Sequence, residues 1–142
     1  MRRAWIHCST MGAGISWDVA ARDDDGSMVL RQDLAATLIY ETFSSTGAAG
    51  GSGTVALPEG SYLDHPSVIH DTTNNRYVFL SDLSTDGLWI YGMDDTSLAQ
   101  DFTTVIDEPS GTNMVSAHGV ALNNNKYGVL ATVDDASAGN IP

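Results

Sequence analysis

Short runs of apolar, β-branched and aromatic residues recur along the whole chain, and clusters of Asp, Asn, Thr and Gly separate them. Runs of about four to eight such residues between turn-forming residues are typical of β-strands. Helical periodicity is nearly absent, and the best helix candidate, residues 33–38, is too short to be stable alone. The pattern therefore predicts an all-β chain of short antiparallel strands at 4–8, 15–20, 27–31, 37–43, 67–69, 77–81, 88–91, 102–106, 116–122 and 127–133.

The polar clusters between these runs are rich in residues that form turns. Asp and Asn tolerate a positive φ and hydrogen-bond to their own backbone. The segment Asp23-Asp24-Asp25-Gly26-Ser27 is similar in composition to a calcium-binding loop, but it lacks the alternating spacing that directs several oxygens at one ion. A plain hairpin turn is therefore favoured there, and tight turns are likewise expected at 72–75, 85–87, 94–95, 123–125 and 134–135.

One segment, residues 44–53, consists of Ser, Thr, Ala and Gly alone. It has no bulky side chain to bury, so we expect a loop or tether inside a single domain that spans residues 1–142. A phosphate-binding loop is disfavoured, because no Lys follows the glycines and no helical pattern begins there.

Several short sequences recur in the chain. The clearest pair is Asn75–Leu80 and Asn125–Leu130, separated by 50 positions, and residues 64–69 match 117–122 at an offset of 53. Repeats of about this length with four short strands each are typical of propeller blades. Two further matches have different offsets: Trp17 with Trp89 and Asp23 with Asp95 at 72, and residues 37–41 with 104–108 at 67.

The repeats predict one complete four-stranded blade at residues 65–108, with strands at 66–70, 77–82, 88–92 and 102–107. The N-terminal part is expected to supply a second strand at 4–8, a third at 15–20 and an outer strand at 37–41. The C-terminal part supplies an inner strand at 116–122 and a second at 127–133. A ring needs at least four blades, so we expect an incomplete propeller-like ring; a two-sheet β-sandwich is the alternative.

The stretch from Asp64 to Asp82 resembles a blade of the sialidase-like and five-bladed glycosidase propellers. Residues 84–89 are similar to the Asp-box turn of sialidases, although one residue is missing and no Thr precedes Trp89. The resemblance covers about half of the chain. It implies a catalytic carboxylate at Asp64, but the matching position of the next blade is Ala117, so the second carboxylate that glycoside hydrolysis requires is not found. The arginine triad of sialidases is also missing.

Three residues at the starts of predicted inner strands are candidate ligand-binding residues: Asp64, His65 and His118. Inner strands of a propeller converge on its axis, where ligands bind. A metal site that combines these histidines with His70, Asp64 or Asp71 has only weak support from spacing, so neither a metal nor a cofactor is predicted. Cys8 is expected to be a buried structural thiol, and the strand aromatics are expected to be mainly core.

Charge narrows the classes of partner. The 142-residue, 15.0 kDa chain carries 18 acidic and 6 basic residues, for a net charge of -12, and Lys126 is its single lysine. This charge disfavours nucleic acid and anionic membranes as partners. Such an acidic surface resembles that of proteins from salt-loving or marine organisms and their viruses. No apolar run suits a membrane span, and polar residues interrupt any signal-peptide core near the N-terminus.

These observations favour a non-catalytic β-rich binding or assembly module, with a virion or cell surface as the expected location. We expect it to be completed by other copies of itself or by another protein, and carbohydrate is a further candidate ligand. The alternative is a fragment of a sialidase-like or five-bladed glycosidase in which Asp64 is the acidic residue. A calcium-stabilised structural domain is a third hypothesis.

Overall fold

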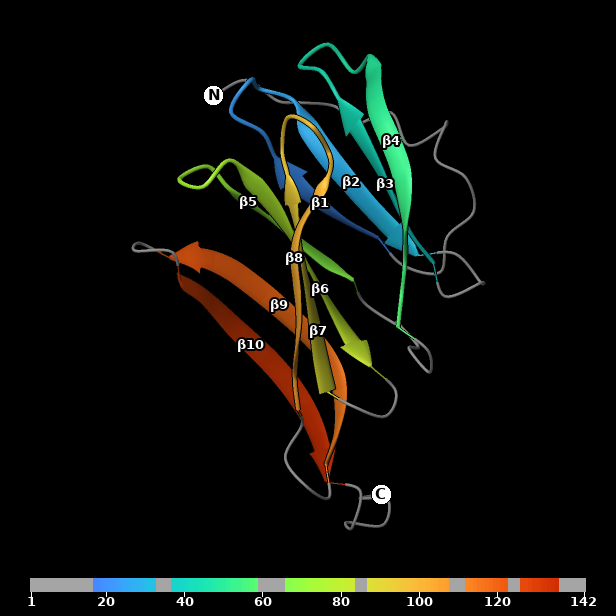
Figure 1. Cartoon of the computed structure of the whole chain (residues 1–142), viewed down its shortest axis with the longest axis vertical. Coiled ribbons are helices and arrows are strands. Elements are labelled where there is room, and N and C mark those ends of the chain that lie inside the picture. The colour runs from blue at the N-terminus through green and yellow to red at the C-terminus, as the bar shows by residue number, and fades with distance from the viewer. Residues whose placement is uncertain are drawn as a thin grey trace.

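Three consecutive antiparallel sheets form the fold (Figure 1). The computed structural model describes residues 17–32, 37–58, 66–83, 87–107, 112–122 and 126–135, and these residues contain no helix. The prediction of an all-β chain is thus confirmed. Sheet A comprises β1 (Trp17–Ala21), β2 (Ser27–Gln32), β3 (Thr37–Phe43) and β4 (Ala49–Ala56); sheet B comprises β5 (Ser67–Asp71), β6 (Arg76–Leu83), β7 (Gly87–Asp94) and β8 (Gln100–Ile106); sheet C comprises β9 (Thr112–Leu122) and β10 (Lys126–Asp135).

Each sheet is an up-and-down meander, in which every strand pairs with the next one in sequence. The turn expected at residues 23–26 is a hairpin, in which Arg22 N–H donates to the Gly26 carbonyl at 3.0 Å. Asp25 and Asn75 have φ values of 61° and 52° in the equivalent turns of sheets A and B. Asp and Asn are among the few residues that adopt this left-handed conformation readily, which explains their presence in these clusters.

The repeat of 50 residues corresponds to the spacing between sheets. Position 30 of β2, position 80 of β6 and position 130 of β10 are all Leu, and each lies in the second strand of its sheet. The unit predicted at 65–108 is sheet B, and the strands predicted at 116–122 and 127–133 form sheet C. The strand predicted at 4–8 lies outside the described residues.

The matches at offsets 72 and 67 were wrong. Trp17 lies in β1, the first strand of sheet A, and is 61% exposed, whereas Trp89 lies in β7, the third strand of sheet B, and is 4% exposed. Residues 37–41 belong to a third strand and residues 104–106 to a fourth. These pairs therefore occupy different places in the meander, and the likeness reflects only the residue types that all strands favour.

The loop or tether predicted at 44–53 was also partly wrong, because residues 49–53 begin strand β4. The glycines of this strand make room for large side chains. A Cβ atom at Gly53 would overlap the Tyr40 hydroxyl, and one at Gly51 would come within 2.6 Å of Leu98 Cδ1. Only the turn before the strand, where Gly47 has a φ of 81°, matches the expectation.

Sheets A and B pack against each other through one apolar core. Met28, Leu30, Leu38 and Tyr40 of sheet A contact Tyr77, Phe79, Trp89 and Met93 of sheet B, and all eight are buried. The centroids of the Tyr40 and Phe79 rings are 6.2 Å apart across this interface. The side chains alternate along each strand, so these residues occupy only one face of each sheet.

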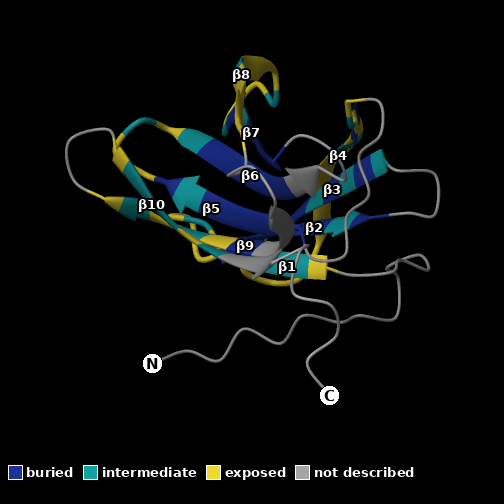
Figure 2. Ribbon diagram, turned by 90° about the horizontal axis from the view of Figure 1, so that it is seen from below, coloured by how far each residue is buried: buried dark blue, intermediate teal, exposed yellow. Residues whose placement is uncertain are grey.

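The opposite face of sheet B packs against sheet C. Ile69, Val78, Leu80, Leu88 and Ile90 form this second core with Ala117, Ala121, Tyr127, Val129 and Ala131. Sheet B is therefore covered on both faces, as the concentration of buried residues on β5 and β6 in Figure 2 illustrates. Three stacked layers do not correspond to the two-sheet sandwich considered as the alternative.

Strand β5 connects all three layers, since it contacts both β1 and β9. On the side of sheet A, Val68 N–H donates to Asp18 Oδ2 at 2.9 Å. On the side of sheet C, the Tyr127 hydroxyl donates to Asp71 Oδ2 at 2.5 Å, and Asp71 also accepts hydrogen bonds from Asn74 and from Thr73 N–H. Burial acts to raise the pKa of Asp71, but these hydrogen bonds outweigh it and hold the pKa below its ordinary value.

We predict that Gly119→Ala destabilises the protein by about 1–3 kcal/mol, because a Cβ atom there would overlap Leu80 and crowd Ile69 between sheets B and C. Gly128→Ala is the matched control on the paired strand, where the nearest atom, Val120 Cγ1, is 3.3 Å away on the open face. Urea denaturation followed by circular dichroism measures both. Equal effects of the two substitutions would contradict the close packing of these sheets.

Tyr127→Phe is expected to lower the free energy of unfolding by about 1–3 kcal/mol at neutral pH, because it removes a hydrogen bond to a carboxylate. The contribution of Asp71 is present above its unfolded-state pKa and is lost as the pH falls through its lower folded-state pKa. The variant should therefore lose less stability than the wild type on acidification. Melting temperatures between about pH 3 and 7 test this, with Tyr91→Phe as a control on the other face of sheet B.

Candidate functional site

Of the three predicted site residues, His118 lies within the described structure. Asp64 and His65 lie outside the described residues, so the glycosidase hypothesis remains a prediction. His118 lies in β9 opposite Leu130, is exposed, and lies on the face of sheet C that points away from sheet B. His70 and Asp71 are neighbours in β5 and point to opposite faces, toward sheet A and sheet C respectively. The described residues contain no group of three or more potential metal ligands.

A hollow of about 570 Å³ lies beside the C-terminal ends of β1 and β5. The turns after β1, β3 and β7 form its walls, and β6 contributes Tyr77. It therefore lies between sheets A and B, at the C-terminal end of β5. The lining residues are Arg22, Asp23, Asp24, Thr42, Phe43, Ser44, Ala48, Ala49, Gly50, Gly51, His70, Tyr77, Asp95, Thr96 and Leu98.

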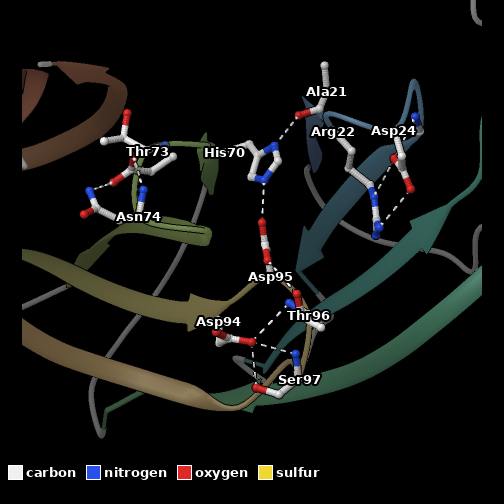
Figure 3. Close-up of polar contacts among 12 residues, drawn as sticks. Ala21, Arg22, Asp24, His70, Thr73, Asn74, Asp94, Asp95, Thr96 and Ser97 are labelled. Atoms are coloured by element: carbon white, nitrogen blue, oxygen red, sulfur yellow. Dashed lines mark hydrogen bonds and ion pairs between the residues drawn. The ribbon is translucent and has the colours of Figure 1, made fainter.

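His70 is the central residue of this hollow (Figure 3). Its Nδ1 lies 3.1 Å from the carbonyl oxygen of Ala21 in β1, and its Nε2 lies 3.0 Å from Asp95 Oδ2 in the β7–β8 turn. The His70 side chain is only 6% exposed. One buried ring therefore connects the last residue of β1, the strand β5 and the turn after β7.

Tyr77 packs directly against this ring. The two ring centroids are 4.7 Å apart with an interplanar angle of 27°, which is a stacked arrangement. Burial raises the pKa of Tyr77 to about 12, and Arg22 opposes this rise while Asp95, Asp24 and Asp23 add to it. The phenol is therefore neutral at physiological pH and acts as a wall of the hollow.

The turn after β1 has its own charge pair. Arg22 Nε and Nη2 each lie 3.1 Å from a carboxylate oxygen of Asp24, which also accepts a hydrogen bond from Gly26 N–H. The hydrogen bond from Arg22 is the main cause that lowers the pKa of Asp24. This exposed bidentate pair fixes the turn beside His70.

Asp94 plays a similar role in the turn after β7. Its Oδ1 accepts hydrogen bonds from Ser97 N–H, the Ser97 hydroxyl and Thr96 N–H, and those from Ser97 are the main cause of its lowered pKa. Leu98 completes the turn with a φ of 57°. The acidic turn expected here is confirmed, and its function in the fold is to present Asp95 to His70.

No sequence pattern predicts the pair of His70 and Asp95. The two residues are 25 positions apart and come together only because β6 and β7 return the chain to the same end of sheet B. From its spacing His70 fits only a weakly supported metal set, and Asp95 only a turn. Within the hollow, the carboxylates Asp24 and Asp95 are already paired, so the geometry supports a connecting role more than a catalytic one.

A second candidate site is the open face of sheet C, defined here as His118, Val120, Leu122, Lys126 and Leu130. Val120 is 57% exposed and Leu130 is 76% exposed. Pairing in the β9–β10 ladder places Leu122 opposite Lys126 and His118 opposite Leu130, so all five side chains lie on one face. None of the residues whose side chains are described on this face is acidic, although the chain has a net charge of -12.

No protein-family model matches the chain, and no curated protein matches it. Among the described residues, no helix is long and apolar enough to cross a membrane.

We predict that the stability of the protein falls as the pH rises from about 10 to 12. Burial in the folded state raises the pKa of Tyr77 to about 12 from 10.0, so its contribution is complete below pH 10 and is lost as the phenol of the unfolded chain ionises. Tyr77→Phe should flatten this alkaline decline in a series of urea melts. An unchanged decline in the variant would show that another group causes it.

Proposed function

We propose that this protein is a non-catalytic assembly module whose sheet C packs against sheet C of a second copy of the chain. One observation carries the proposal. The open face of sheet C has apolar residues at the same positions through which sheets A and B each pack against the next sheet.

The equivalence holds position by position. Ala20, Met28 and Leu30 of sheet A face sheet B, and their exposed fractions are 7% or less. The corresponding residues of sheet B, which are Ile69, Val78 and Leu80, face sheet C and are equally buried. In sheet C these positions are Val120, Gly128 and Leu130, and the two large side chains are exposed. The open face therefore matches faces that another sheet covers elsewhere in the chain.

The choice of a second copy follows from which faces remain open. Each sheet contacts the sheet before it through one particular face. In sheet B this face bears Tyr77, and the equivalent face of sheet A bears Val29. In sheet A the middle of this face is covered, because Val29 is 2% exposed, although Trp17 at its edge is 61% exposed. The matching surface that a second copy can offer is thus the open face of its own sheet C. Contact between two identical surfaces gives a dimer with twofold symmetry.

Charge determines the conditions under which such a dimer forms. Two chains of net charge -12 repel each other at long range, but the contact face itself carries Lys126 and His118 and no described carboxylate. Salt shortens the range of repulsion to about 8 Å at 0.15 M and about 3 Å at 1 M, while the apolar contact persists. We therefore expect association to strengthen with salt.

The propeller interpretation concerns the three sheets within one chain and is a second part of the proposal. Consecutive antiparallel meanders, with β5 in contact with the first strands on both sides, support an arrangement of the propeller type. A location on a virion or cell surface, and carbohydrate as an additional ligand, remain expectations from the sequence.

Leu130→Asp tests the proposal. It places a carboxylate at the most exposed apolar position of the open face, and we expect at least a tenfold weaker dimerisation, equivalent to about 1.4 kcal/mol. Sedimentation velocity at about 0.15 and 1 M NaCl measures it. Val105→Asp is the matched control, because Val105 is an exposed apolar residue of β8 outside the open face.

A wild-type chain that stays monomeric at both salt concentrations would overturn assembly through a second copy. A dimer that Leu130→Asp and Val105→Asp weaken equally would overturn the assignment of the contact to sheet C.

A further inference from the structure

We propose that His70 is a proton-dependent connection between sheets A and B, which holds the end of β1 only while both ring nitrogens carry a proton. This inference concerns the interior of one chain and is independent of the proposed assembly.

The number of protons on the His70 ring follows from its two contacts. The carbonyl oxygen of Ala21 can only accept a hydrogen bond, and so can the ionised carboxylate of Asp95. Both lie within 3.1 Å of a ring nitrogen of His70. A neutral imidazole has a single N–H and can donate to only one of them. The arrangement with both contacts formed therefore requires the doubly protonated, positively charged ring.

The two contacts are not equal. A hydrogen bond to an ionised carboxylate is roughly twice as strong as one to a neutral carbonyl. When the ring loses a proton, the remaining N–H stays on Nε2 and keeps its bond to Asp95 within sheet B. Nδ1 then presents a lone pair to the Ala21 carbonyl, which repels it. Loss of the proton consequently releases the end of β1 in sheet A and keeps the contact within sheet B.

Charged and titratable groups face His70 from three of the surrounding elements. The turn after β1 contributes Arg22, Asp23 and Asp24, the turn after β7 contributes Asp95, and β6 contributes the stacked phenol of Tyr77. Strands β3 and β4 and their turn contribute only uncharged residues to the hollow. Three carboxylates and one guanidinium thus surround the ring.

The consequence is local because β1 is held to β5 at two points. At its start, Asp18 accepts the hydrogen bond from Val68 N–H, and at its end the Ala21 carbonyl accepts the one from His70. The first contact does not involve a histidine. Loss of the second leaves β1 attached at its start, so the end beside the hollow opens while the core between the sheets stays closed.

Nitrogen-detected NMR of the imidazole rings tests the proton count in the wild-type chain. The resonance of His70 is identified by its nuclear Overhauser contact with the stacked Tyr77 ring, which needs no variant. We expect both nitrogens to carry a proton at about pH 5 and only Nε2 to carry one at about pH 8. A ring with one proton at pH 5, or one that retains its proton on Nδ1 at pH 8, would overturn the proposal.

Hydrogen exchange tests the structural consequence. The amide of Arg22 donates within the turn that follows Ala21, so it reports on the end of β1. We expect its protection factor to fall about fivefold between pH 5 and 8, which corresponds to the loss of one hydrogen bond. His118→Gln, which alters an exposed histidine of sheet C, should leave this change intact, whereas His70→Gln should abolish it. Persistence of the change in His70→Gln would show that another group causes it.

Discussion

The double burial of sheet B is the constraint on which the rest of the structure depends. Strands β5, β6 and β7 place apolar residues on both faces, with Phe79 directed toward sheet A and Leu80 toward sheet C. Neither face can remain in water without a cost of about 25 cal/mol for each Å² of apolar surface. Sheets A and C are thus held in place by a requirement of the sheet between them, and the order of the layers follows the order of the chain.

The same constraint explains why sheet C has a surface of unusual character. In this repeat, each sheet presents one face to the sheet before it and one to the sheet after it. Tyr127 and Val129 lie on the face toward the preceding sheet and pack on sheet B. Val120 and Leu130 lie on the opposite face, which would contact a following sheet, and are exposed. Their exposure is therefore a property of position in a repeat, which distinguishes this patch from the isolated exposed apolar residues that every protein surface carries.

Local pattern was enough to predict every described strand except β4, and the turns at 23–26, 72–75 and 94–95, because alternation and turn chemistry act over a few residues. It was not enough to align the repeats. The spacing of 50 residues is structurally meaningful at Leu30, Leu80 and Leu130, whereas the match of Trp17 with Trp89 joins an exposed first strand to a buried third strand. Composition likewise suggested a tether at residues 44–53, although Gly53 is required in a strand by the ring of Tyr40 above it. The contact of His70 with Asp95 depends on how two layers meet, which no local pattern records.

The excess of Asp over Glu has a structural cause in addition to its effect on solubility. Of the 18 acidic residues only three, at positions 41, 59 and 108, are Glu. Asp18, Asp24, Asp71 and Asp94 each accept at least one hydrogen bond from a backbone N–H, and the last three do so within their own turns. The shorter side chain reaches the adjacent backbone, which the longer Glu does less well. A chain of many short strands needs many such turns. Much of its negative charge therefore follows from its architecture, and the proposed surface for association between copies lies where no turn is present, on the face of sheet C.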